Sequence, residues 1–210
     1  MDNTRIKNAI VSIEKYFETK TGPEPDVSAT AVVENGLMCH IQSPDGRSVR
    51  TDMSEAVGGT ATANSPGWLC RAAIASCDAT LLAIRAARTG IELDKIEVRV
   101  DAMSDGRGMF LEEGISPAST EVRVLFNVSA KDVSREQIQE LVDWVVEHSP
   151  VGNDIARAVN MVVELKTGQQ LSEPSYVECQ KLVSRFVCAH IAVPWTCNGG
   201  YQLCCRGLAH

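Results

Sequence analysis

The stretch from Ser65 to Gly90 constrains the fold of this chain more than any other. Ser65 can cap a helix through its hydroxyl, Pro66 suits the first helical position, and Gly90 suits the left-handed residue that closes a helix. Between these ends the apolar residues recur at steps of three and four, the period of a helix with buried faces. They are Leu69, Ala73, Cys77, Leu81, Ile84 and Ala87. The sequence therefore predicts a long central helix that carries a thiol, Cys77, in its middle.

The residues before this helix indicate an amphipathic helix and then a three-stranded antiparallel meander. An apolar face of three isoleucines and Phe17 predicts the helix. The hairpin signal Asn35-Gly36 separates the first two strands, and a Pro-Asp-Gly turn separates the second from the third. The expected elements are a helix at 4–19 and strands at 27–33, 37–42 and 48–52.

The residues after the central helix indicate two more strands and then mainly helix. Apolar and polar residues alternate in both strand segments, which is the pattern of a strand with one wet face. Ser134 with Gln137 forms a capping-box pattern at the start of a helix that Pro150 ends. The expected elements are strands at 96–102 and 122–128, a helix from 134, a short helix at 155–159 and a last strand at 161–165. This order predicts an α+β fold with mainly antiparallel pairing.

The composition bounds the domain and excludes some function classes. The chain has 210 residues and is 44% hydrophobic but only 5% aromatic, so it can bury a core, and that core is aliphatic. We place the domain at 1–168 and interpret 169–210 as a cysteine-rich, poorly ordered appendage. A net charge of −7 argues against a nucleic-acid partner. No apolar run reaches the ~18–20 residues that span a bilayer, and 1–21 does not resemble a signal peptide, so we expect a cytoplasmic protein without a membrane partner.

The positions of the cysteines indicate a reducing compartment. Of the eight cysteines, only Cys39, Cys70 and Cys77 lie in the first 168 residues. The spacing in the tail does not match a C-x-x-C zinc pattern, so we expect neither a metal site nor a cofactor. Cys70 and Cys77 are seven residues apart on one helix. That separation is ~10 Å along the axis, which is too far for a disulfide, and we expect Cys70 to pack in the core.

Two interpretations of Cys77 are open from the residue types alone. A free cysteine is among the most buried residue types, so Cys77 can be a small core hydrophobe. It can also be a nucleophile, which requires a thiolate and therefore a positive neighbour and some exposure.

Four stretches carry a family resemblance. They are the approach from Gly58-Gly59 to Ser65-Pro66, the helix segment 72–77, the turn at 89–93 and the residues 147–151. Together they resemble the OsmC family of osmotically induced and organic-hydroperoxide-resistance proteins. The resemblance implies an OsmC-like α+β fold, with antiparallel sheets around the long helix. It also implies an intertwined homodimer whose thiol site lies at the subunit interface.

The resemblance implies an activity for Cys77. In the family the matching thiolate attacks the O–O bond of a hydroperoxide, becomes a sulfenic acid and is captured by a second cysteine. In this chain Ser149 stands at the second position, and Gly67 matches a glutamate that helps hold a catalytic arginine. The implied function is therefore a one-cysteine, peroxiredoxin-like peroxidase that reduces organic hydroperoxides in oxidative-stress defence and is regenerated by an external thiol reductant.

The remaining candidate catalytic residues are Arg47, Arg50, His148 and Ser149. The two arginines, on or near the third strand, are the expected partners of the thiolate. His148 can lower the pKa of a thiol, although a lone histidine is more often structural. Gly67 and Ser149 favour a competing hypothesis, in which a non-catalytic dimer of the same fold binds a small apolar ligand in its interface pocket.

Overall fold

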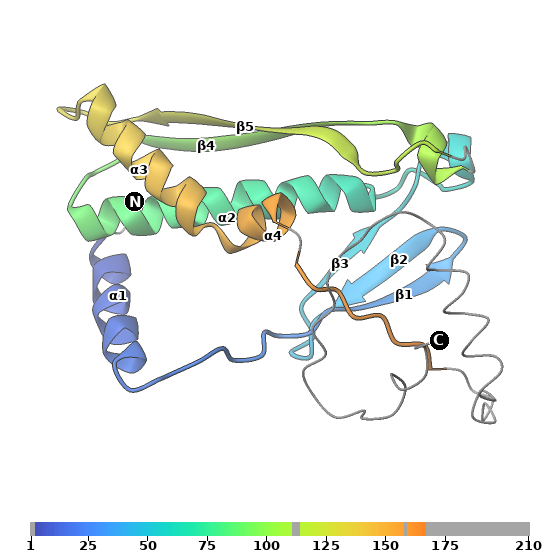
Figure 1. Ribbon diagram of the computed structural model, residues 1–210, viewed down its shortest axis with the longest axis horizontal. Helices are drawn as coiled ribbons and strands as arrows, with labels where there is room; N and C mark the ends of the chain where they lie inside the picture. Colours follow the sequence, from blue (N-terminus) through green and yellow to red (C-terminus); the bar gives the residue numbers. More distant parts are fainter. Residues whose placement is uncertain (1–2, 111–113, 158, 167–210) are drawn as a thin grey trace, which may run out of the picture. The chain divides into compact units, whose positions relative to one another are not determined.

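The structure is a computed structural model that describes residues 3–110, 114–157 and 159–166 (Figure 1). The chain divides into a unit that ends at Asn160 and a second unit that begins at Met161. The expected appendage, 169–210, and its boundary at 168 lie outside the described residues.

The first unit has the predicted α+β architecture, with two separate antiparallel sheets. One sheet has the order β1-β2-β3 and the other pairs β4 with β5. The strands predicted before residue 130 are all present, with ends that differ by a few residues. The elements are α1 (Asn3–Phe17), β1 (Thr30–Asn35), β2 (Met38–Gln42), β3 (Ser48–Thr51), α2 (Pro66–Thr89), β4 (Lys95–Ser104), β5 (Ser119–Ser129), α3 (Arg135–His148) and α4 (Pro150–Ala156), with short 3-10 helices at Glu55–Val57 and Gly106–Met109.

The ends of α2 are the predicted ones. The Ser65 hydroxyl accepts a hydrogen bond from the backbone N–H of Trp68 at 3.2 Å, and Pro66 occupies the first turn. Gly90 closes the helix with φ of 80°, a conformation that a side chain disfavours. These local signals are strong because they satisfy backbone groups that a helix end leaves unpaired.

The buried stripe of α2 differs from the predicted one by about one residue. The buried positions are Ile74, Asp78, Leu82, Ala86 and Ala87. The apolar pattern alone cannot fix the stripe because α2 is apolar on several faces, and it packs against β4, α3, α1 and α4 (Figure 1). Its contacts with these four elements select which face is most deeply buried.

The core next to α2 is aliphatic, as predicted. Its buried members are Leu82, Ala86, Leu93, Leu141 and Val145. Trp144 and Phe126 are partly buried and pack against this cluster from α3 and β5. Burial of these side chains holds α2, α3 and the β4–β5 sheet together.

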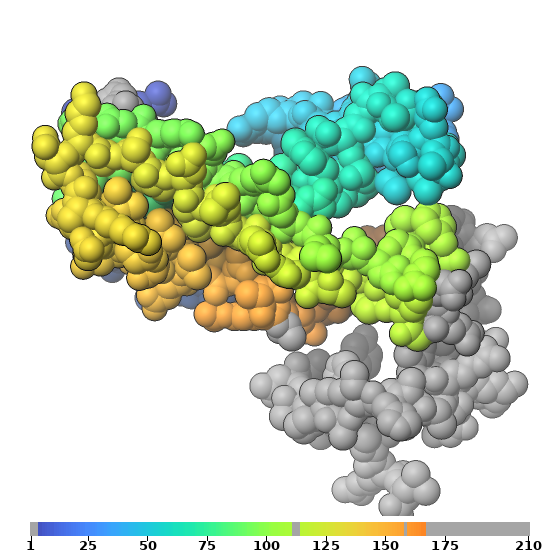
Figure 2. Space-filling model, turned by 90° about the horizontal axis from the view of Figure 1, so that it is seen from above, coloured from blue at the N-terminus to red at the C-terminus, as the bar shows by residue number. Residues whose placement is uncertain are grey.

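The β4–β5 pair has one face toward α2 and one face outward. In the space-filling view the pair lies at the surface with no other element over it (Figure 2). Residues of β4 alternate between half-buried Ile96, Val98 and Val100 and exposed charged residues. The predicted alternation of a strand with one wet face is therefore confirmed.

Ser149 separates α3 from α4 and caps the second of these helices. The predicted capping box at the start of α3 is present, since Ser134 and Gln137 exchange hydrogen bonds. α3 ends at His148, just before Pro150, as predicted. The short helix that follows, α4, runs over Pro150–Ala156, so the predicted bounds of 155–159 are wrong. The local reason is Ser149, whose hydroxyl accepts from the backbone N–H of Gly152 at 3.1 Å and so caps a new helix.

A buried carboxylate holds the loop that leads into α2. Asp52 is 1% exposed and accepts hydrogen bonds from the backbone and hydroxyls of Thr60 and Thr62 and from the Met53 backbone. Those bonds, led by the Thr60 hydroxyl, hold the pKa of Asp52 well below its usual value. Gly59 lies within this turn, where a Cβ would overlap the Met53 carbonyl group.

By length and composition, α2 is also long and apolar enough to cross a membrane, and no other helix of the described residues is. The expectation that no segment is apolar enough to span a bilayer is therefore wrong for this helix. Asp78 interrupts the apolar sequence of α2, and four elements of the domain pack against the helix. These contacts are those of a central helix in an α+β domain.

The described part of the second unit, residues 161–166, forms no helix or strand. The predicted last strand at 161–165 is therefore wrong. Its valines favour extended backbone, but a strand also needs a hydrogen-bonding neighbour, and none of the described residues pairs with it. Met161, Val162 and Val163 are exposed.

Candidate thiol site

Cys77 and Ser149 meet where the α3–α4 corner lies against the middle of α2. The Ser149 hydroxyl donates to the Cys77 sulfur at 3.6 Å, across 72 residues of sequence. Cys77 is half-buried and Ser149 is 2% exposed. The family resemblance matched Ser149 to the position of a second cysteine, and in the structure its hydroxyl lies beside the Cys77 sulfur.

Gly152 holds the Ser149 hydroxyl from the other side. Its backbone N–H donates to the Ser149 oxygen, as part of the cap on α4. A Cβ at position 152 would lie 3.0 Å from that oxygen and 4.0 Å from Oδ1 of Asp78. The hydroxyl is thus fixed between the first turn of α4 and α2.

Asp78 is the functional candidate that sequence reasoning missed. It follows Cys77 on α2, is 4% exposed, and its Oδ1 is buried without a hydrogen-bond partner. Burial raises the pKa of Asp78, and the neighbouring Ser149 hydroxyl partly opposes that rise. One signal was available in the sequence: Asp78 is the only charged residue between Arg71 and Arg85.

The two candidate arginines bind acidic groups close to them in the meander. Arg47 pairs with Asp45, whose pKa this contact lowers to about 2. The Nε of Arg50 lies 3.6 Å from a carboxylate oxygen of Glu34. Both guanidinium groups are exposed, and neither contacts Cys77 within the part of the chain that the structure describes.

His148 is held by its own helix. Its Nδ1 lies 2.8 Å from the Trp144 carbonyl oxygen, which only accepts, so Nδ1 carries the proton of this bond. Its ring stacks on Trp144 with centroids 4.2 Å apart, and the guanidinium of Arg85 lies 4.9 Å from the Trp144 centroid. These contacts orient His148 on α3, and none of them involves the thiol.

Two further positions lie toward the start of α2. Cys70 is exposed, so the expectation that it packs in the core is wrong, because the contacts of α2 bury a different stripe. A Cβ at Gly67 would lie 3.7 Å from the Arg71 guanidinium, so this position has room for a side chain. Among the described residues, no group of three histidine, cysteine or acidic side chains is placed to hold a metal.

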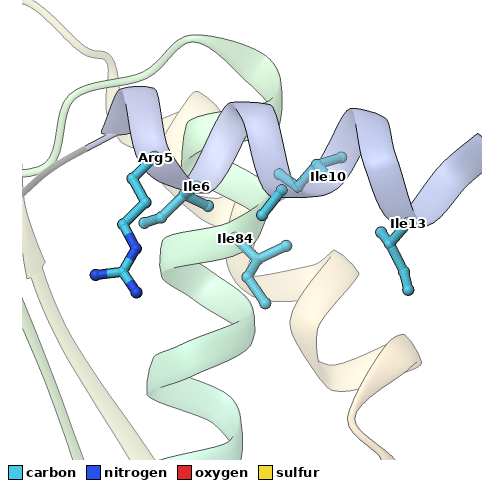
Figure 3. A pocket seen from close by; sticks show the side chains of 6 residues that line it. Arg5, Ile6, Ile10, Ile13 and Ile84 are labelled. Carbon is cyan, nitrogen blue, oxygen red and sulfur yellow. The ribbon is translucent and has the colours of Figure 1, made fainter.

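A separate apolar groove lies between α1 and α2. It has a volume of about 610 Å³, and Figure 3 shows Ile6, Ile10 and Ile13 along α1 with Ile84 of α2 beside them. Ile84 is seven residues beyond Cys77, so the groove and the thiol share one helix but not one site. The groove is lined by Arg5, Ile6, Ala9, Ile10, Ile13 and Ile84.

Comparison with known families then assigns the fold. The family model for the OsmC-like protein matches residues 59–164, which include α2, both strands of the second sheet, α3 and α4. The chain belongs to the OsmC-like protein family. The matched range contains Cys77, Asp78 and Ser149, so the thiol site lies inside the OsmC-like domain. No protein among the curated sequences matches the chain.

Solved structures share the OsmC-like fold. An OsmC-like protein of Mycoplasma pneumoniae has 16% identity and a TM-score of 0.55, over 64% of this chain and 89% of its own. A protein of Aquifex aeolicus has 12% identity and a TM-score of 0.50, over 63% and 89%. The organic hydroperoxide resistance protein OhrB of Bacillus subtilis has 29% identity and a TM-score of 0.42, over 61% and 88%. The first two likenesses support the fold.

Proposed function

We propose that this protein is a thiol-dependent peroxidase that reduces organic hydroperoxides in oxidative-stress defence, with Cys77 as the reacting thiol. The observation that carries the proposal is the 3.6 Å contact between Cys77 and Ser149 in the middle of an OsmC-like domain. Ser149 can donate a hydrogen bond to a thiolate, which stabilises the charged form. Cys77 is half-buried, and a reacting thiol needs such partial exposure.

The proposed reaction uses one cysteine of the protein. The Cys77 thiolate attacks the terminal oxygen of the hydroperoxide, an S–O bond forms, the O–O bond breaks, and the alkoxide leaves and takes up a proton. Cys77 is then a sulfenic acid. Because Ser149 has no sulfur to capture it, an external thiol forms a mixed disulfide and releases water. A second external thiol displaces Cys77 and restores it.

We also propose a homodimer, because one chain leaves much apolar surface uncovered. A cytoplasmic location is part of the proposal, because the three described cysteines are free thiols, which is typical of a reducing compartment. Val32 and Val33 of β1 and Val49 of β3 are more than 40% exposed, and α2 is apolar while only five of its residues are buried. Large exposed apolar side chains on a folded domain favour an interface that covers them. An intertwined dimer would cover it, and it would let Arg47 and Arg50 act on a thiolate across the interface. Light scattering on the purified chain tests the dimer.

Purified protein with and without Cys77→Ser tests the peroxidase. Consumption of cumene hydroperoxide with dithiothreitol as reductant is expected to fall to the background rate in the variant. Cys70→Ser is the matched control, because Cys70 lies on the same helix and is exposed. Equal rates for wild type and Cys77→Ser contradict the proposal.

The groove of α1 and α2 favours a second candidate function, the binding of a small apolar ligand without catalysis. Its lining is almost entirely aliphatic. Titration with Nile red is expected to give saturable fluorescence that Ile84→Glu abolishes. A thiol reagent titrated against pH then separates the two functions, since a Cys77 thiolate present below about pH 7 supports catalysis and an ordinary thiol supports binding alone.

A further inference from the structure

A buried acid faces the same hydroxyl that contacts the thiol. Oδ1 of Asp78 is buried and unpartnered, and it borders the small space at Gly152 that the Ser149 oxygen also borders. A buried polar atom without a partner is destabilising, and in native proteins such an atom often marks a functional group. The structure therefore gives Asp78 no stabilising role that would explain its place in an apolar helix.

Ser149 has one proton and two acceptors beside it. Its oxygen already accepts from the Gly152 N–H, so its own hydrogen is free to be donated. In the structure it donates to the Cys77 sulfur at 3.6 Å, and Oδ1 of Asp78, which borders the same space at Gly152, is the second acceptor near the hydroxyl. A hydroxyl placed in this way can pass a proton between the two groups.

We infer that Asp78 is a positioning residue of the proposed peroxidase, which acts through Ser149 to hold the proton released by Cys77 and to return it to the leaving alkoxide. The inference rests on the proposed function, because only a substrate with an oxygen leaving group needs that proton. Cys77 and Ser149 touch the reacting atoms, whereas Asp78 acts one step away.

The proton balance closes without any further reagent. As the thiolate forms, the Cys77 proton moves to the Ser149 oxygen and the Ser149 proton moves to the Asp78 carboxylate. The thiolate then attacks the hydroperoxide, and the O–O electron pair leaves with the alkoxide. The Ser149 proton passes to the alkoxide, and the Asp78 proton replaces it on Ser149. The products are a sulfenic acid, an alcohol and the Asp78 carboxylate.

The electrostatics of the site suit this role. Burial raises the pKa of Asp78 toward that of a thiol, which lowers the free-energy cost of moving a proton between them. None of the other ionisable groups on the packed elements has a hydrogen bond or ion pair to Asp78 within the described chain. The charged residues and the histidine of these elements are Arg5, Lys7, Glu14 and Lys15 of α1, Lys95, Glu97, Arg99 and Asp101 of β4, Arg135, Glu136, Glu140, Asp143, Glu147 and His148 of α3, and Asp154 of α4. Glu14 pairs with Arg88.

Two electrophiles separate this role from a structural one. Iodoacetamide releases iodide, which needs no proton, whereas cumene hydroperoxide releases an alkoxide, which does. Single-turnover rates with both are measured by mass spectrometry on the tryptic peptide 72–85, where Cys77 is the only cysteine, with dimedone trapping the sulfenic acid. The peptide 51–71 contains only Cys70 and reports exposed-thiol reactivity in the same sample.

Asp78→Asn is expected to slow the hydroperoxide reaction at pH 7 at least about tenfold relative to alkylation. Ser149→Ala should give the same selective loss, and the double variant should lose no more than either single variant, because both residues serve one relay. Equal loss with both electrophiles, or additive losses, overturns the inference. If Asp78→Asn fails to fold, Ser149→Ala carries the comparison. A wild type that is alkylated but inert to hydroperoxide contradicts the proposed function itself, and the inference falls with it.

Discussion

The hydroxyl of Ser149 lies 3.6 Å from the sulfur of Cys77. The contact exists because α3 stops at His148 and Ser149 caps α4, which turns the chain back against the middle of α2. Gly152 completes the corner by donating to the same hydroxyl. A cap that stabilises a short helix therefore also sets a hydrogen-bond donor on the thiol.

The first prediction follows directly from that distance. Ser149→Cys is expected to form a disulfide with Cys77 on mild oxidation, because sulfur has a larger radius than oxygen and the two side chains already touch. Mass spectrometry should find the tryptic peptides 72–85 and 136–157 cross-linked, each with one cysteine in the variant. Ser149→Ala provides the control. Two free thiols after oxidation would show that the side chains cannot reach bonding geometry.

A second prediction concerns the turn before α2. Gly59→Ala places a Cβ against the Met53 carbonyl, a backbone atom that cannot move aside freely. We expect a loss of about 1–3 kcal/mol in the free energy of unfolding, measured with urea. Gly106→Ala is the control because a Cβ there meets nothing, and its change should stay within about 0.5 kcal/mol. Equal stability of both variants would contradict the close approach.

The third prediction is a pH dependence from Asp52. Its folded pKa lies below its unfolded value of about 3.9, so its contribution to stability is present above that pH and is lost as pH falls toward the folded pKa. The difference in unfolding free energy between wild type and Asp52→Asn should therefore be largest near neutral pH and shrink below about pH 4. Thr60→Val removes the main donor and should show an intermediate slope. Parallel curves would refute this role.

Asp78 should behave in the opposite sense. Its folded pKa lies above its unfolded value, so ionisation makes the folded state less stable as pH rises through about 3.9 and up to the folded pKa. Asp78→Asn is then expected to melt at a higher temperature than wild type at pH 7 and at a similar temperature near pH 3. Calorimetry at both pH values checks this. A lower melting temperature at pH 7 would mean that the ionised carboxyl has stabilising contacts.

Local signals made much of the fold predictable. Ser65, Pro66 and Gly90 marked the ends of α2 because capping depends on residues next to each other in sequence. The buried face of α2 was less predictable, since it depends on which elements pack against it. The last strand at 161–165 failed for a related reason, because a strand is defined by a neighbour that its own residues do not specify.

The site was predictable only where a family pattern supplied long-range information. Ser149 and Cys77 are 72 residues apart, and no periodicity links them. Asp78 was visible as an isolated charge in the helix, but its burial and its unpartnered oxygen are properties of the packed domain. Arg47 and Arg50 carry the right charge for a thiolate partner, yet acidic neighbours in the meander bind both within one chain.

Gly152 lies close to the Ser149 hydroxyl, so substitutions at positions 149 and 152 are expected to depend on each other. A Cβ there would lie 3.0 Å from the Ser149 hydroxyl oxygen, so a larger residue at 152 would move that hydroxyl by a few tenths of an ångström. The Ser149 hydroxyl is the group that favours glycine at position 152. If the serine is replaced or moves, that constraint is removed and other residues can occupy position 152. Pairs of substitutions at these two sites would thus mark lineages in which the thiol site has been remodelled.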